Sequence, residues 1–189
     1  DGVFIRNFNR KKIIAVEPCK NLAKLTNTMG YKTYPFFWDL KLSQQIENKF
    51  GKVDLIFSAN TISHIPNLTE VFKSIKIILK KEGVFVFEDP YILSVIKNTS
   101  YDQFYDEHAH VFSLIAVTNL LKIFDLKVID LEHLNTHGGS MRYYIAHEDS
   151  NYKVEKIVKK TQKLELKYKL NKFSTYKKFG EKVKKSKIK

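Results

Sequence analysis

Cysteine is almost absent from this sequence, because Cys19 is the single cysteine among 189 residues. One thiol cannot close a disulfide within the chain, and it cannot form a cysteine-based zinc site by itself. A disulfide framework is therefore excluded. We expect Cys19 to be a small buried thiol.

Long hydrophobic runs are also lacking. No stretch reaches the roughly eighteen apolar residues of a membrane-spanning helix. The beginning of the chain holds only one short apolar run, at residues 13–16, and does not resemble a signal peptide. We therefore expect a soluble, cytoplasmic protein that has no membrane partner. Since the chain begins with Asp1 and not with Met, we also expect it to be a piece of a longer protein.

Arginine is the third scarce residue type, with Arg6, Arg10 and Arg142 as its three examples. The formal net charge is +13, but residues 1–150 carry only +1 of it and residues 151–189 carry +12. A nucleic-acid-binding face is typically lined with basic and aromatic side chains. The scarcity of arginine and the confinement of the charge to the tail argue against a nucleic-acid enzyme. A binding module that docks its basic tail on RNA is the alternative hypothesis.

The remaining pattern predicts an α/β protein with one domain at residues 1–149 and a lysine-rich, amphipathic helical linker at residues 150–189. Apolar runs rich in branched and aromatic residues predict strands at residues 12–16, 53–58, 84–88 and 126–131. Helices are predicted between them, at residues 21–29, 43–50, 67–83 and 114–124. Such alternation indicates a mostly parallel sheet. Residues 140–147 predict a last strand, antiparallel at the sheet edge.

Polar residues follow three of the predicted strands. Glu17 ends the first strand, Asn60 follows the second, and residues 88–91 end the third. Ligands of parallel α/β sheets bind beyond the carboxyl ends of the strands, so we expect these three ends to face one crevice. A carboxylate such as Glu17 can accept hydrogen bonds from both hydroxyls of a ribose. A solvated strand end explains Glu17 equally well.

The segment Tyr105-Asp106-Glu107-His108 holds the residue types that proton transfer requires. A histidine can remove a proton near neutral pH, a carboxylate can orient it, and a tyrosine hydroxyl can stabilise a developing enolate oxygen. A polar loop before the helix that Ser113 caps is the simpler alternative. A metal held by Glu107, His108 and His110 is less favoured than proton transfer.

Two further segments contain candidate site residues. His64 lies in the loop after the second predicted strand, where a lone histidine is more often simply exposed. Gly138 and Gly139 follow His137 and precede Ser140, and paired glycines allow a tight turn or a close approach of backbone to a ligand. Taken alone, this segment favours a turn into the last strand.

Together these segments resemble the sugar C-methyltransferases. The resemblance covers the chain nearly end to end. It rests on Asn60-Thr-Ile-Ser-His64-Ile-Pro66-Asn67, Leu79-Lys-Lys-Glu-Gly83-Val-Phe-Val-Phe-Glu88-Asp-Pro90-Tyr91, Tyr105-Asp-Glu-His108, Phe112-Ser113 and Thr136-His-Gly-Gly-Ser140-Met-Arg142. Members of that family are class I enzymes that use S-adenosylmethionine to methylate nucleotide-linked keto-deoxysugars. The resemblance implies a Rossmann-like class I methyltransferase sheet and a nucleotide-linked sugar or similar small molecule as the partner.

The resemblance also implies roles for individual residues. In the family, the residue matching His108 is the base that removes a proton beside the sugar ketone. Supporting roles in placing the substrate or stabilising the enolate fall to Tyr105, Glu107 and His64. Cofactor contacts fall to Asp1, Gly2, Glu17, Pro18 and Asn60. Substrate contacts fall to Tyr91, His137, Gly138, Gly139 and Ser140.

The match with the family's overall organisation is partial. Of the family's first strand and its Asn-Asp-Gly turn, only Asp1 and Gly2 are present here. The family also has a zinc module before the methyltransferase domain and a second α/β domain after the linker helix. We expect no metal in this chain, with zinc confined to the upstream module.

Overall fold

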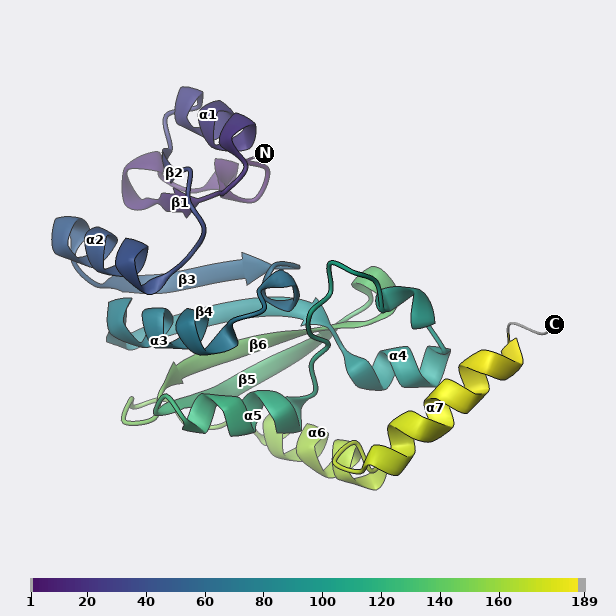
Figure 1. Ribbon diagram of the computed structural model, residues 1–189. Helices are drawn as coiled ribbons and strands as arrows, with labels where there is room; N and C mark the ends of the chain where they lie inside the picture. The colour runs from purple at the N-terminus through teal and green to yellow at the C-terminus, as the bar shows by residue number, and fades with distance from the viewer. Residues whose placement is uncertain (1, 187–189) are drawn as a thin grey trace.

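The computed structural model describes residues 2–186, and its centre is a mixed four-stranded sheet. The strands are β3 (Val53–Ala59), β4 (Leu79–Pro90), β5 (Leu126–Leu134) and β6 (Ser140–His147). Their order in the sheet is β3-β4-β6-β5 (Figure 1). β3 and β4 run parallel, and β6 is antiparallel to both of its neighbours. The predicted α/β fold with an antiparallel last strand is thus confirmed.

The position of β6 differs from the prediction, which places it at the sheet edge. β6 instead lies between β4 and β5 and pairs with both. The reason is burial on both faces of the strand: Ile145 and Ala146, which point to opposite faces, are both fully buried. A strand that is apolar on both faces is more stable inside a sheet than at its edge.

Two short parallel strands form a separate sheet near the amino terminus (Figure 1). They are β1 (Ile14–Val16) and β2 (Lys32–Tyr34), joined by helix α1 (Lys20–Thr28). β2 escapes sequence prediction because three residues give no usable periodicity. No described strand hydrogen-bonds this pair to β3. The ring of Phe4 stacks on that of Phe57 in β3 at 4.0 Å between centroids, and so connects the small sheet to the large one.

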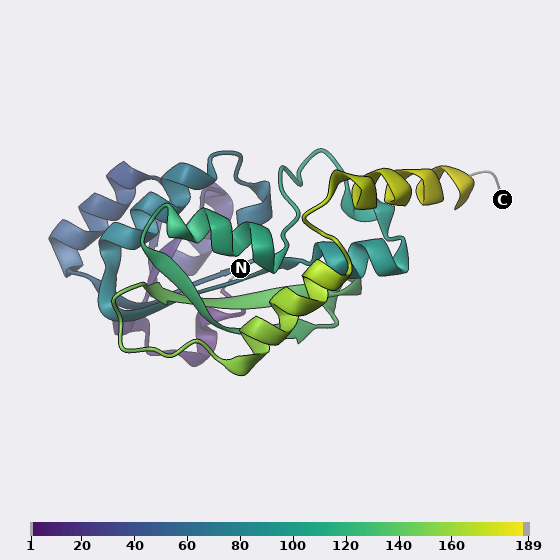
Figure 2. The same ribbon diagram turned by 90° about the horizontal axis from the view of Figure 1, so that it is seen from below.

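Helices α2 (Leu40–Phe50), α3 (Leu68–Ile78) and α5 (Leu114–Lys122) lie along one face of the large sheet (Figure 2). The predicted caps are present: Asn67 accepts from the backbone N–H of Glu70, and Ser113 accepts from that of Ala116. α3 ends at Ile78 and not beside Gly83 as predicted. Residues 79–83 instead enter β4 through a bulge, because Val53 pairs with Leu79 while Leu55 pairs with Val84.

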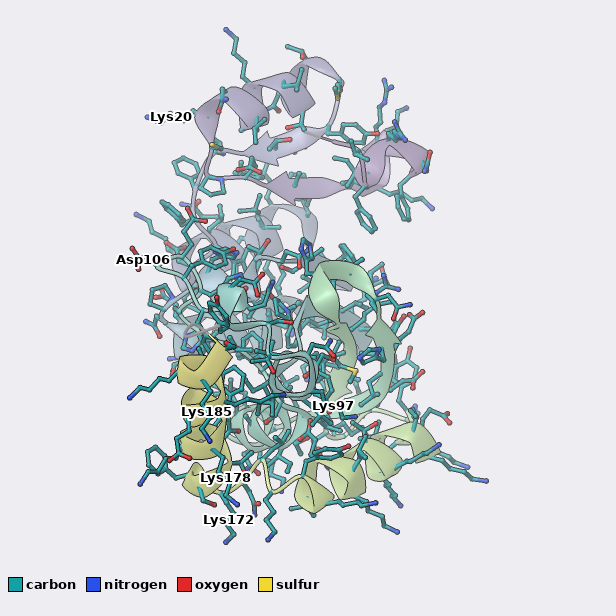
Figure 3. All side chains as sticks on the ribbon, turned by 90° about the vertical axis from the view of Figure 1, so that its right-hand side faces the viewer. Lys20, Lys97, Asp106, Lys172, Lys178 and Lys185 are labelled. Carbon is teal, nitrogen blue, oxygen red and sulfur yellow. The ribbon has the colours of Figure 1, made fainter. Side chains whose placement is uncertain are left out.

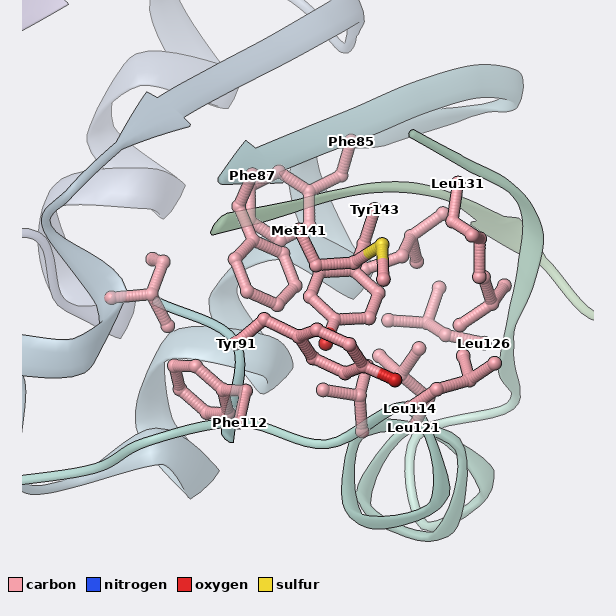
Figure 4. Close-up of a cluster of buried hydrophobic side chains, with 14 of the residues drawn as sticks. Phe85, Phe87, Tyr91, Phe112, Leu114, Leu121, Leu126, Leu131, Met141 and Tyr143 are labelled. Carbon is pink, nitrogen blue, oxygen red and sulfur yellow. The ribbon is translucent and has the colours of Figure 1, made fainter. Parts of the chain in front are cut away.

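The core of the large sheet is aromatic. Phe72, Phe85, Phe87 and Tyr143 are all at most 1% exposed. The rings of Phe87 and Tyr143 stack at 4.8 Å on neighbouring strands β4 and β6. Figure 4 shows this cluster reaching from β4 and β6 to α5. Because the core lies directly under the ends of β3 and β4, it holds the loops that follow those strands.

Two helices form the lysine-rich tail: α6 (Lys156–Lys167) and α7 (Phe173–Ser186). α6 buries Glu165 completely, and both carboxylate oxygens accept backbone N–H groups at the start of α5, from Leu114 at 2.7 Å and Ile115 at 2.8 Å. α7 has no fully buried residue, although Phe179 contacts the ring of Phe104. No helix within residues 2–186 has the length and apolar character needed to cross a bilayer.

Candidate active site

The structure brings together three of the predicted residues: His64, Tyr105 and His108. His64 ends the short 3-10 helix η3 (Ile62–His64) after β3, and the other two lie in the loop after η4 (Tyr101–Gln103). The rings of His64 and His108 meet edge to face at 4.8 Å, and the ring of Tyr105 lies 4.2 Å from that of His108. Tyr105 is 47% exposed, so the group opens to solvent on its side.

Hydrogen bonds indicate the tautomer of the neutral His108 ring. Its Nδ1 lies 2.7 Å from the carbonyl oxygen of Gln103, and its Nε2 lies 3.1 Å from the Tyr105 hydroxyl. A carbonyl oxygen only accepts, so Nδ1 carries the ring proton and donates it to Gln103. Nε2 keeps a lone pair and accepts from Tyr105. This is the arrangement that a general base requires.

A buried carboxyl group close to His108 belongs to the predicted strand end 88–91 but was not among the predicted site residues. Asp89, near the end of β4, is 0% exposed, and its Oδ1 accepts from the hydroxyl of Ser63 at 2.5 Å and from the Ser63 N–H at 3.3 Å. Burial raises the pKa of Asp89 to about 6, against the opposing effects of the Ser63 hydrogen bonds and of His108. Its position before Pro90 at a strand end was the available sequence signal.

The other proton-transfer candidates make different contacts. Glu107 is exposed and has no hydrogen-bond partner among the described residues. The Nε2 of His110 lies 3.2 Å from the carbonyl oxygen of Pro66 and therefore faces away from His108. The structure thus does not gather Glu107, His108 and His110 around one point, as a shared metal ion would require.

Tyr91 is placed in the core and not on an open surface. Its side chain is 3% exposed and packs within the cluster that Figure 4 shows. Burial raises the pKa of its hydroxyl, with a further increase from the nearby charge of Glu165. The backbone of Tyr91 has the local role, since its N–H donates to the carbonyl oxygen of Gly139. The backbone of Tyr91 therefore helps to hold the glycine turn in place.

The segment from His137 to Ser140 forms a tight turn through η5 (Thr136–Gly138). Gly138 and Gly139 have φ values of +76° and +120°, which favour glycine. His137 is exposed, whereas Ser140 is buried and its hydroxyl donates to the carbonyl oxygen of Thr136. The turn borders a cavity of about 380 Å³ with polar lining residues: Ser94, Lys97, Asn98, His133, Asn135, Gly138 and Gly139.

Replacing Gly139 with alanine tests this turn. A Cβ at position 139 would overlap the Oγ and Cβ of Ser94, whereas a Cβ at Gly51, which also has positive φ, would meet no atom within 4 Å. Both changes strain the backbone. We expect Gly139→Ala to lower the free energy of unfolding by about 1–3 kcal/mol more than Gly51→Ala does, because only it overpacks a neighbour. Equal losses in urea denaturation would show that the turn can move away from Ser94.

Two of the predicted cofactor residues, Glu17 and Asn60, follow strands that belong to different sheets. Glu17 follows β1, and its Oε1 accepts from the N–H of Cys19, while Pro18 between them is exposed. Cys19 is exposed and not buried as predicted, because it stands at the open start of α1. Asn60 follows β3 with φ +49°, and its buried Oδ1 has no hydrogen-bond partner among the described residues.

The remaining two cofactor candidates are at the start of the chain. Gly2 has φ +78°, and a Cβ there would lie 3.1 Å from the sulfur of Met29. Asp1 lies outside the described residues. The two strand ends that carry Glu17 and Asn60 belong to sheets that are not hydrogen-bonded to each other within residues 2–186.

Comparison with known proteins shows the family of this chain. Residues 1–131 match the family model described as a methyltransferase domain, and residues 135–189 match that of the C-methyltransferase C-terminal domain. The chain belongs to the methyltransferase domain family. It is 29% identical over 147 residues to the C-methyltransferase NovU of Streptomyces niveus. The match covers 78% of this chain and 35% of NovU, so the chain spans about a third of its relative's length.

Solved structures show the same fold. An S-adenosylmethionine-dependent methyltransferase from Anabaena variabilis matches with a TM-score of 0.57 at 14% identity, over 76% of this chain and 71% of that one. One from Clostridium acetobutylicum matches with a TM-score of 0.52 at 18% identity, over 71% and 74%. The Rossmann-like methyltransferase fold is therefore established.

The residues of this methyltransferase fit its cofactor, S-adenosylmethionine. The buried, unpartnered Oδ1 of Asn60 can accept from an amino or hydroxyl group of a ligand at the end of β3. The Glu17 carboxylate stands at the carboxyl end of β1, where a ribose is commonly bound in such folds. S-adenosylmethionine is rich in hydrogen-bond donors. Asn60 Oδ1 and the Glu17 carboxylate are acceptors that such a ligand can use.

Proposed function

We propose that this methyltransferase transfers a methyl group to the carbon next to the ketone of a nucleotide-linked keto-deoxysugar, or of a similar small molecule. The observation that carries the proposal is the lone pair on His108 Nε2, which faces the Tyr105 hydroxyl at 3.1 Å beside the ring of His64. The kinship with a C-methyltransferase supports carbon as the acceptor atom. His108 is the general base.

Proton removal begins at the acceptor carbon. Nε2 of His108 takes the proton, and the electron pair of the broken C–H bond moves into the ketone to form an enolate. The Tyr105 hydroxyl can rotate from Nε2 toward the ketone oxygen and donate to it. His64, whose ring stands against that of His108, is the second donor within reach of that oxygen. Glu107, exposed at the rim, would contact the substrate from the solvent side.

When bound, the cofactor would supply an electrophilic methyl group, carried on a sulfonium, to the substrate carbon. We propose that Asn60, Glu17, Pro18 and Gly2 hold the cofactor, with Asp1 beside them. Holding carbon and methyl in line contributes much of the rate in such a transfer.

We propose that the turn around Gly138 and Gly139 binds the nucleotide part of the substrate. The cavity beside Gly138 and Gly139 is lined by Lys97 and His133, and no carboxylate lines it. The Lys97 amine lies 4.6 Å from the centroid of the Tyr168 ring and would turn from it toward an anion in the cavity. Its residues therefore suit the phosphates of a nucleotide-linked sugar. A Cβ on Gly138 would lie 3.7 Å from the hydroxyl of Ser100, which directly precedes η4. The cavity thus adjoins the segment that carries Tyr105 and His108.

The direct test uses a panel of nucleotide-linked 3-keto and 4-keto sugars in heavy water. We expect the full-length protein to exchange the hydrogen beside the ketone for deuterium and, with S-adenosylmethionine, to form a new carbon–methyl bond, both seen by mass spectrometry. Methyl transfer to oxygen or nitrogen alone would contradict the proposal. Ketones without the nucleotide serve as the control for substrate class.

The basic tail supports the RNA-binding hypothesis less well. Lys172, Lys178 and Lys185 extend from the tail into solvent (Figure 3), as the lysines of any solvated helix would. Packing explains part of the apolar face of α7, since Tyr176 and Phe179 lie against the main core, whereas Phe173 is 82% exposed. Neither observation requires a nucleic acid.

A further inference from the structure

Ser63 connects the three segments that form the candidate active site. Its hydroxyl and N–H both donate to Asp89 at the end of β4, and its carbonyl oxygen accepts from the N–H of His110 at 3.0 Å. His64 is the next residue along the chain, and His108 is two residues before His110. One fully buried serine therefore joins the strand end, the His64 helix and the His108 loop.

Asp89 is the fixed end of this connection. It lies in a strand paired on both sides, through Glu88 with Ala59 and through Asp89 with Met141. Its Oδ1 holds Ser63, while its Oδ2 is buried without a hydrogen-bond partner in the described part of the chain. A buried carboxylate with one unpartnered oxygen lowers the stability of the folded state. Such incompletely hydrogen-bonded groups are often found where their charge has a functional role.

We propose that Asp89, acting through Ser63, is the positioning residue that sets His64 against His108 and directs a negative charge at the buried side of the histidine pair. Asp89 lies in the Glu88-Asp89-Pro90-Tyr91 segment at the end of β4, and its contact with the reacting atoms is indirect. The inference rests on the proposed proton transfer by His108. An anion there favours the imidazolium that forms when His108 takes a proton.

Groups from three elements bear on the ionisation of Asp89. Ser63 in η3 holds the carboxylate by two hydrogen bonds, and the positive charge that the His108 ring carries when it is protonated lowers the pKa of Asp89. Tyr143 in β6 is close enough for Asp89 to contribute to the raised pKa of its hydroxyl. His64, also in η3, adjoins Ser63. The carboxyl titration of Asp89 therefore reports on both Ser63 and His108.

The test follows the carboxyl ¹³C signal of Asp89 by NMR as a function of pH, assigned by its loss in Asp89→Asn. We expect a midpoint near 6 in the unaltered protein. The midpoint should rise in Ser63→Ala and in His108→Gln, because each change removes an effect that favours the anion. His147→Gln is the control, since that ring lies 3.1 Å from the carbonyl oxygen of Leu79, and it should leave the midpoint unchanged.

A second readout measures the position of the rings. Proton contacts between the His64 and His108 rings should weaken in nuclear Overhauser spectra of Ser63→Ala. For Asp89→Asn, whose amide oxygen can still hold Ser63, the contacts should persist while kcat falls at least about tenfold and KM for S-adenosylmethionine stays within about twofold. An Asp89 midpoint that is insensitive to His108→Gln, or His64–His108 ring contacts that persist in Ser63→Ala, would overturn the proposal. Both NMR readouts need no substrate, so they remain decisive even if no keto sugar is methylated.

Discussion

His108→Gln is expected to lower the rate of methyl transfer by about 10²–10⁴-fold, because it removes the lone pair that accepts the substrate proton. Glutamine is close to histidine in size and can still donate to the carbonyl oxygen of Gln103, so the loop should keep its conformation. Exchange of the hydrogen beside the ketone into heavy water should fall by the same factor. Binding of S-adenosylhomocysteine, measured by calorimetry, should not change.

The matched control is His110→Gln. His110 lies in the same loop, but its ring contacts Pro66 and not the histidine pair. We expect its rate to stay within about threefold of the unaltered protein, since no proton-transfer group is lost. If His108→Gln retained full exchange activity, another group would be the base. If both variants lost activity equally, loop order and not basicity would be the cause.

Glu165→Ala is expected to lower the free energy of unfolding by about 2–4 kcal/mol, since it removes both acceptors of a buried helix start. The N–H groups of Leu114 and Ile115 would remain buried without these partners. Chemical denaturation measures the loss directly. Glu181→Ala, an exposed glutamate on α7, is the control and should change the stability by less than about 0.5 kcal/mol. A loss no larger than in the control would show that water replaces the cap.

The pH dependence of that loss has a defined sign. Burial raises the pKa of Glu165 above its ordinary value of 4.5, despite the two N–H groups that favour the anion. The folded state then binds the proton more tightly than the unfolded state does. Its contribution to stability is therefore largest below pH 4.5 and falls as the pH rises through the folded-state pKa. Glu165→Gln should lose this part of the pH dependence.

The sequence predicted features whose causes are local. The caps Asn67 and Ser113 depend on residues three positions away, and both are present. His64, Tyr105 and His108 could be placed in one site because they lie in spaced motifs at the ends of successive elements. The end of α3 was missed because Gly83 is a frequent helix terminator, whereas the bulged pairing of β4 with β3 decides the outcome.

The features that the sequence left unpredicted depend on burial between distant segments. Asp89 and Glu165 are ordinary acidic residues in the sequence, and only the folded chain shows each at 0% exposure with backbone N–H groups as partners. The place of β6 between β4 and β5 likewise follows from long-range pairing, which period-two alternation does not encode. Tyr91 was predicted to contact the substrate, and only the folded chain shows that its ring lies in the core.

The hydrogen bonds from α5 to Glu165 have a practical consequence for anyone who divides this protein into fragments. A cut at residue 150 looks harmless, because the composition changes there and the lysine-rich segment begins. Such a truncation would nevertheless remove the hydrogen-bond acceptors of the first turn of α5 and expose the core around Leu114 to solvent. Expression boundaries, domain swaps and deletion experiments on the tail should therefore be set beyond α6, so that a loss of folding is not mistaken for a loss of binding.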